Sequence, residues 1–292
     1  MVKFGRLLTA MVTPFNTEGK VDYGTAAVLA KRLVENGSDG LVVAGTTGES
    51  PTLTVDEKLR LFSTVVEAVG GKATVIAGTG SYSTSDSIHL TKEAEQTGVD
   101  GVLLVAPYYN RPPQEGLFRH FKTIAGATSL PVMVYNIPSR TGVNVTPDTM
   151  VRLAEIENIV ALKESAGNLA QASELAHRLP EDFSIYSGDD ALTLPMMAVG
   201  AVGVISVASH VAGRKISAMI DAFTRGDVKA AHQIHNELLP LFNVLFLTTN
   251  PIMVKAAVNL IGIPAGGVRL PLVEATAAEK EKLKEVLQGL GL

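Results

Sequence analysis

Residues able to carry out chemistry stand at the ends of short apolar runs in this chain. Lys163 follows the apolar run 159–162, which begins with a β-branched pair and is typical of a buried strand. Burial of an amine disfavours its charged form, so its pKa falls and it can be a neutral nucleophile near pH 7. Such an amine can form a Schiff base with a carbonyl substrate. The alternative is a lysine that is only the first solvated residue after a strand.

Two more side chains with suitable chemistry follow another apolar run. Tyr135 comes directly after residues 132–134, so its ring would be partly buried and its hydroxyl would lie at the end of the strand. A phenol placed there can pass protons to and from an amine. Arg140 offers a planar guanidinium suited to a carboxylate. The alternatives are a core tyrosine with an ordinary hydrogen bond and a solvated loop arginine.

The loop at residues 45–50 has the composition of an anion site. Its sequence is Gly-Thr-Thr-Gly-Glu-Ser, in which the glycines allow a tight turn that brings backbone N–H groups close to an anion. The hydroxyls of Thr46 and Thr47 add donors. The loop matches neither a dinucleotide-binding motif nor a P-loop. A substrate carboxylate fits better, and a plain strand-to-helix turn is the alternative.

Other predicted strand ends add small, aromatic and acidic residues. Tyr108 and Tyr109 stand at the end of the fourth apolar run, at the rim of the expected site. Gly188 follows a later run and leaves access, and the aspartates at 189–190 are expected to cap the next helix. A lysine, a phenol, an arginine and a Gly/Thr loop at several strand ends are hard to explain as coincidence.

These side chains can meet only if the strands that carry them lie side by side. Apolar runs alternate with helical patterns to about residue 210, and helix starts are marked by Asp22, the capping box Thr54–Glu57 and Thr146. Eight such units predict an α/β fold, a (β/α)8 TIM barrel with its active site at the carboxyl ends of the strands. A doubly wound open sheet is the alternative. The predicted strands are 7–12, 40–44, 74–77, 101–106, 131–135, 159–163, 184–186 and 203–207.

The rest of the chain has no strand pattern. We predict a barrel over residues 1–224 and a C-terminal helical extension over 225–292, packed on the barrel as one structural unit. No Pro-, Gly- or Ser-rich linker separates the two parts. The predicted helices after the last strand are 218–224, 228–246, 251–261 and 275–290.

Composition excludes several classes of protein. Of 292 residues, 46% are hydrophobic and 18% are charged, which supplies a large core and gives little sign of disorder. A formal net charge of −4 argues against nucleic-acid binding. The absence of cysteine excludes disulfides and thiolate metal sites. No stretch reaches membrane-spanning length and no signal peptide is apparent, so we expect a cytoplasmic protein that does not bind membranes.

The same motifs resemble the signature segments of the dihydrodipicolinate synthase family. The wider superfamily, which includes N-acetylneuraminate lyase and other pyruvate-dependent aldolases, shares the lysine and the Gly/Thr loop. The Asn-Ile-Pro-Ser-Arg-Thr sequence together with the paired tyrosines points to the synthase family itself. The resemblance covers essentially the whole chain. The segments that carry it are 45–49, 107–110, 135–142, 162–164 and 250–255.

This resemblance implies an enzyme that condenses pyruvate with L-aspartate-4-semialdehyde on the diaminopimelate route to lysine, with no metal or organic cofactor. Lys163 would form the Schiff base with pyruvate, and Tyr135 would be the general acid and base. Tyr135 would be linked through Thr46 to Tyr109. In the family this last tyrosine comes from a neighbouring subunit, so the resemblance implies a homo-oligomer. No residue decides between a dimer and a dimer of dimers.

The resemblance also implies how the two substrates are held. Thr47 and backbone amides would hold the pyruvate carboxylate, and Ile205 and Gly188 would contribute to the same pocket. Arg140 would bind the carboxylate of the semialdehyde.

Regulation is where the sequence departs from the better-known members of the family. Lysine-inhibited members carry histidines in the helix after the Gly/Thr loop, with an asparagine and a glutamate nearby. Here Val55, Lys58, Tyr82 and Asp86 stand at those positions. The positive charge of Lys58 and the apolar Val55 side chain disfavour a lysine effector, so we expect weak or absent feedback inhibition.

Other chemistries receive little support from the sequence. His232 and His235 lie three residues apart on a predicted helix, but no third ligand stands at a suitable spacing, so a solvated helix is favoured over a metal site. A serine hydrolase is unsupported because no Gly-x-Ser-x-Gly motif occurs. Two alternatives remain open: another class I pyruvate aldolase with a different acceptor, and a catalytically silent barrel that only binds a keto acid. The second would require loss of Lys163 or Tyr135.

Overall fold

Eight parallel strands close into a barrel in the computed structural model, which describes residues 4–292. The strands are β1 (Leu7–Ala10), β2 (Gly40–Val43), β3 (Thr74–Gly78), β4 (Gly101–Val105), β5 (Val132–Asn136), β6 (Ile159–Glu164), β7 (Ser184–Ser187) and β8 (Gly203–Ser206). Each strand pairs with its neighbours in the sequence, and β1 also pairs with β8. The predicted (β/α)8 barrel is therefore confirmed, and the doubly wound open sheet is wrong.

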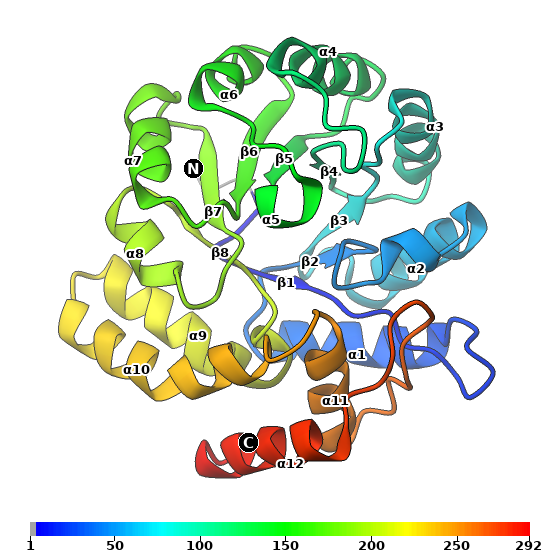
Figure 1. Ribbon diagram of the computed structural model, residues 1–292, viewed down its shortest axis with the longest axis vertical. Helices are drawn as coiled ribbons and strands as arrows, with labels where there is room; N and C mark the ends of the chain where they lie inside the picture. The colour runs from blue at the N-terminus through cyan, green and yellow to red at the C-terminus, as the bar shows by residue number, and fades with distance from the viewer. Residues whose placement is uncertain (1–3) are drawn as a thin grey trace.

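Helices surround the strands, as Figure 1 shows in a view along the barrel. Within residues 4–292, none of them is long and apolar enough to cross a membrane. The helices are α1 (Tyr23–Glu35), η1 (Ser50–Thr52, a 3-10 helix), α2 (Val55–Val69), α3 (Thr84–Glu95), α4 (Gln114–Ala125), α5 (Pro138–Thr141), α6 (Pro147–Ala154), α7 (Leu169–Arg178), α8 (Thr193–Ala198), α9 (Ser209–Thr224), α10 (Val228–Val244), α11 (Ile252–Leu260) and α12 (Ala277–Gly289).

Side chains alternate between the inside and the outside of the barrel along each strand. In β5, Met133 and Tyr135 belong to a cluster that fills the barrel, whereas Val132 and Val134 pack between the strands and the helices. Both faces of the strands are thus buried, which is why they read as continuous apolar runs. The inner cluster consists of Phe4, Leu8, Ala10, Val42, Ile76, Leu103, Met133, Tyr135, Ala161, Tyr186 and Ile205.

Two of the predicted helix starts are confirmed in detail. The Asp22 side chain accepts a hydrogen bond from the backbone N–H of Thr25 at 2.9 Å, and Thr54 forms its capping box with Glu57. Thr146 does precede α6, but no side-chain capping bond forms there. Its hydroxyl donates instead to the side-chain oxygen of Gln114, at 3.1 Å. Thr146 therefore contacts Gln114 of α4 and the Thr149 hydroxyl of its own helix, and it does not cap the backbone of α6.

The ends of the predicted strands agree with the observed strands to within two residues, whereas one helix start is wrong. α9 begins at Ser209, well before the predicted start at residue 218, and Ala212 has non-helical backbone angles that separate its first turn from the rest. At the kink, a Cβ atom on Gly213 would lie 2.4 Å from the carbonyl oxygen of Asn36. The glycine allows α9 to approach the end of α1, and it also interrupted the helical pattern in the sequence.

The last three helices pack together beside the barrel. α10 packs against α9, and α12 packs against both α10 and α11. Figure 1 shows this group on one side of the molecule, next to α1 and α9. The ends of α10, α11 and α12 agree with the predicted ends to within two residues.

Candidate active site

Lys163 lies inside the barrel, near the carboxyl end of β6. The register of β5 and β6 places it directly beside Tyr135. Its side chain is buried, with 6% of its surface exposed, and its Nζ atom lies 4.2 Å from the centroid of the Tyr135 ring. The strand that ends in this lysine therefore delivers an amine into an apolar interior, as the sequence predicted.

The surroundings of Lys163 favour a neutral amine. Burial is the main cause that lowers the pKa of Lys163, to about 7, and the positive charge of Arg140 acts in the same direction. The carboxylate of Asp190 partly opposes both. Near pH 7 a substantial fraction of this amine carries a free lone pair, which is the requirement for attack on a carbonyl group.

Tyr135 supplies the proton donor that this chemistry needs. Its side chain is 4% exposed, and burial raises its pKa to about 12, although Arg140 and the neighbouring hydroxyls of Ser165 and Thr46 oppose the rise. The phenol is therefore protonated at neutral pH. A protonated phenol beside a largely neutral amine can give a proton to an oxygen that forms on the adjacent carbon.

A cavity of about 200 Å³ opens at the carboxyl ends of β2 to β5. Tyr135 lines it, whereas Lys163 lies behind the Tyr135 ring and is not one of the lining residues. The cavity brings together Thr46, Tyr135 and Arg140, which the sequence placed on three different segments. Its other walls are small or apolar, so a small molecule can enter. The lining residues are Ala44, Gly45, Thr46, Ser50, Pro51, Gly78, Gly80, Leu103, Val105, Tyr108, Tyr135, Ile137, Arg140 and Thr141.

The Gly/Thr loop has a strained backbone. Ala44, just before the loop, and Glu49, within it, have φ angles of 51° and 56°, in the left-handed region. A Cβ atom on Gly48 would lie 3.0 Å from the Cα atom of Ala44, so the turn needs a glycine at this position. Thr47 is buried, and its hydroxyl accepts a hydrogen bond from the Asn250 side chain at 2.9 Å. Thr47 lies beside the cavity and does not line it.

Arg140 stands at the rim of the cavity, in the short helix α5. Its guanidinium donates a hydrogen bond to the backbone carbonyl of Asn250, at 3.3 Å. Asn250 thus connects Arg140 with Thr47, and it belongs to the segment between α10 and α11. The sequence marked this segment only through the family resemblance and assigned it no role.

Gly188 lies beside Lys163, and Ile205 belongs to the same buried cluster as Tyr135. A Cβ atom on Gly188 would lie 1.8 Å from the Oγ atom of Ser165 and 2.9 Å from the Cε atom of Lys163, so only a glycine lets both side chains pack against residue 188. Ile205 is buried in the inner cluster together with Tyr135. Neither residue lines the cavity itself.

Tyr109 is a predicted site residue that projects from the surface of the single chain. Its side chain is 92% exposed, its φ angle is 71°, and it does not line the cavity. The preceding residue, Tyr108, lines the cavity, and its ring packs edge-on against Tyr82 at a centroid distance of 5.3 Å.

The prediction that the acids after β7 cap the next helix is wrong. The Asp190 carboxylate accepts hydrogen bonds from the backbone N–H groups of Val207 and Ala208, both at 2.9 Å, and from the Ser206 hydroxyl. α8 has no side-chain capping bond. Asp190 joins the ends of β7 and β8, and its charge acts on Lys163. Sequence reasoning missed this because the partners lie on a different strand.

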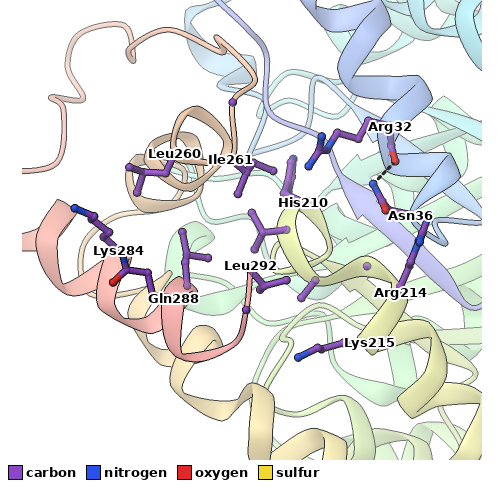
Figure 2. Close-up of a pocket in the computed structure, with 16 residues that line it drawn as sticks. Arg32, Asn36, His210, Arg214, Lys215, Leu260, Ile261, Lys284, Gln288 and Leu292 are labelled. Carbon is purple, nitrogen blue, oxygen red and sulfur yellow. Dashed lines mark hydrogen bonds between the residues drawn. The ribbon is translucent and has the colours of Figure 1, made fainter.

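A larger hollow of about 790 Å³ lies among α1, α9, α11 and α12, away from the strand ends (Figure 2). Arg32 and Arg214 are among its basic side chains, but it contains no predicted site residue. His210 lines this hollow, and both of its ring nitrogens already form hydrogen bonds. Nε2 accepts from the backbone N–H of Val12, and Nδ1 pairs with the carbonyl oxygen of Val207. The smaller cavity is therefore the better candidate for catalysis.

Comparison with known proteins agrees with this geometry. The family model of the dihydrodipicolinate synthetase family matches residues 3–290. The chain belongs to this family. A relative from Desulforamulus reducens, named 4-hydroxy-tetrahydrodipicolinate synthase, is 63% identical over 292 residues, which cover 100% of this chain and 99% of that protein. Another of the same name, from Moorella thermoacetica, is 60% identical over 291 residues and covers 100% of both.

A solved structure gives the same result for the fold. The crystal structure of the enzyme from Cyanidioschyzon merolae with lysine bound superposes with a TM-score of 0.99, at 50% identity and over 100% of both chains. The predicted family is confirmed, and with it an enzyme of the class I aldolase type. Membership of this family makes the protein a carbon–carbon lyase with a (β/α)8 barrel fold.

Proposed function

We propose that the cavity beside Lys163 condenses pyruvate with L-aspartate-4-semialdehyde, the 4-hydroxy-tetrahydrodipicolinate synthase activity for which the relatives are named. One observation carries this proposal: a buried amine with a pKa of about 7 lies beside a protonated phenol at the mouth of the barrel. These are the two groups that a Schiff-base reaction requires.

The proposed reaction begins with the neutral amine of Lys163. Its lone pair adds to the keto carbon of pyruvate, and Tyr135 passes protons to the oxygen, which leaves as water. The resulting iminium draws the electron pair of a methyl C–H bond, so that loss of the proton gives an enamine. The enamine carbon then attacks the aldehyde carbon of the semialdehyde. The lysine itself is the electron sink in this sequence.

We propose separate sites for the two carboxylates. Thr47 and the backbone amides of its loop would hold the pyruvate carboxylate, with Gly188 and Ile205 shaping the space around the lysine. Arg140 would bind the carboxylate of the semialdehyde, because its guanidinium lines the cavity and is available at the rim. The hydrogen bonds of Asn250 to Thr47 and Arg140 support a fixed spacing between these two sites.

We further propose that the active form is a homo-oligomer, at least a dimer. Tyr109 would extend from one subunit into the cavity of another and continue the proton path from Tyr135 through Thr46. Its exposure in the single chain supports this arrangement, since an aromatic side chain at a rim gains from burial against a partner.

The test is a coupled assay of the full chain with both substrates, run beside Lys163→Ala and beside Lys31→Ala, an exposed lysine of α1. We expect Lys163→Ala to lose at least about a thousandfold in kcat and Lys31→Ala to match the wild type. If the wild type is inactive but borohydride traps a pyruvate adduct, the acceptor is wrong and another aldolase activity replaces the synthase. Absence of both turnover and adduct would leave only a keto-acid-binding barrel.

A further inference from the structure

The hydroxyl of Ser165 is a buried polar group beside the reacting amine. Ser165 follows β6 directly, and its backbone N–H donates to the carbonyl oxygen of Asn136 at 2.8 Å, which fixes it between the ends of β5 and β6. Its Oγ atom is shielded from solvent and has no hydrogen-bond partner within residues 4–292. Buried hydroxyls are nearly always paired in native proteins, so an unpaired one at a catalytic centre needs an explanation.

The position of this hydroxyl is defined by Gly188. A Cβ atom on Gly188 would lie 1.8 Å from the Oγ atom of Ser165 and 2.9 Å from the Cε atom of Lys163. Both atoms therefore pack against residue 188 and lie close to each other, which only a glycine at this position allows. The Tyr135 hydroxyl lies close enough to that of Ser165 for the serine to lower the pKa of the phenol, but the two hydroxyls do not reach hydrogen-bonding geometry. A group covalently attached to the lysine nitrogen would lie among these three side chains.

We propose that Ser165 contacts the substrate: its hydroxyl donates a hydrogen bond to the oxygen of the carbinolamine that forms when Lys163 adds to a 2-keto acid. This inference rests on the proposed function, because it requires an adduct on the lysine. The adduct supplies the partner that the hydroxyl lacks in the free chain.

The step balances without a further reactant. The amine lone pair forms the C–N bond, the carbonyl π pair moves to the oxygen, and a proton passes from the nitrogen to this oxygen through Tyr135. A second proton from the phenol allows the C–O bond to break, so that water leaves and the C=N⁺ bond forms. Ser165 holds the oxygen as its charge changes and then releases it as water.

The test compares Ser165→Ala with Ser184→Ala in the full chain. Ser184 is a buried serine of β7 that pairs with Ala161 of β6, at the opposite end of the strands, so it controls for the loss of a buried hydroxyl. The rate at which borohydride-trapped pyruvate adduct forms is measured by mass spectrometry from pH 5 to 9. We expect Ser165→Ala to lower the plateau rate about three- to tenfold and Ser184→Ala to leave it unchanged.

Two further measurements on Ser165→Ala distinguish a contact of the hydroxyl with the substrate from a general structural effect of the substitution. The pH at which adduct formation declines should stay the same in Ser165→Ala, since a displaced lysine would titrate elsewhere, and KM for the semialdehyde should not change. The inference is overturned, while the proposed function stands, if Ser165→Ala forms the adduct at the same plateau rate as the wild type. It is also overturned if the pH at which adduct formation declines differs between the two. Absence of any adduct in the wild type overturns the proposed function and this inference together.

Discussion

At the level of single residues, the site works because two ordinary side chains have unusual surroundings. Lys163 and Tyr135 are both buried in the barrel, and burial disfavours the charged form of each. The same physical cause therefore lowers the pKa of the amine and raises the pKa of the phenol. The result is a nucleophile and a proton donor that are both ready at neutral pH, side by side on neighbouring strands.

This electrostatic arrangement predicts the pH dependence of adduct formation. Protonation of Lys163, whose pKa is about 7, removes the lone pair, so the rate of pyruvate adduct formation should fall below pH 7, by about tenfold for each pH unit. Arg140 lowers the pKa of Lys163, so Arg140→Gln should move this limb to higher pH. Borohydride trapping across pH 5 to 9 measures both profiles. A flat wild-type profile from pH 5 to 8 would contradict the prediction.

At the level of elements, the C-terminal extension holds the Gly/Thr loop in place. Glu49, at the end of the loop, is buried and accepts a hydrogen bond from the Lys255 ammonium of α11 at 2.8 Å. It also accepts one from the backbone N–H of Arg269 at 2.9 Å. Burial lowers the pKa of Lys255 to about 8, and Glu49 opposes this. We propose on this basis that the barrel, 1–224, and the extension, 225–292, act as one structural unit.

Breaking this ion pair should affect both stability and substrate binding. Lys255→Met leaves the Glu49 carboxylate buried without its ammonium partner, which should cost about 3–5 kcal/mol in the free energy of unfolding. The loosened loop should also raise KM for pyruvate more than it lowers kcat. Urea unfolding and steady-state kinetics give the two values, with Lys282→Met on the exposed face of α12 as control.

A double variant that changes both members of the ion pair tests its contribution to the stability of the loop. Glu49→Gln combined with Lys255→Met removes the unpaired charge and should recover part of the lost stability. If the single variant Lys255→Met unfolds at the same urea concentration as the control, the ion pair does not hold the loop.

The success of sequence prediction at this scale depended on whether the interaction was local. The strands and the capping box at Thr54 were predictable, because apolar runs and residues three apart carry the information themselves. The partners of Asp190 and of Lys255 lie on other elements, and no local pattern marks them. Ser165 was missed for the same reason, since its significance depends on Gly188, which is distant in the sequence.

At the level of the whole molecule, we predict little inhibition by lysine. Val55 and Tyr82 are exposed side chains, and Lys58 adds a positive charge where lysine-inhibited members carry a histidine. A cationic effector is disfavoured by a like charge. Coupled assays with and without millimolar lysine should show almost equal rates, and near-complete inhibition would show that the effector site is retained.

The oligomeric prediction concerns the exposed Tyr109, which projects from the surface with a left-handed backbone. If each site borrows this phenol from a neighbouring subunit, a site is complete only when an intact Lys163 and an intact Tyr109 come from different chains. Tyr109→Phe and Lys163→Ala should each be nearly inactive alone. A hybrid dimer of the two would nevertheless contain one complete site.

Complementation of these two variants therefore tests whether the site is shared. Random mixing by co-expression makes half of the dimers hybrids with one working site of two, so activity should recover to about a quarter of the wild type. The double variant Tyr109→Phe/Lys163→Ala co-expressed with Lys163→Ala is the control, because no pairing restores the lysine. Failure of the first mixture to exceed this control, with hybrids verified by native mass spectrometry, would place Tyr109 outside the proton path between subunits.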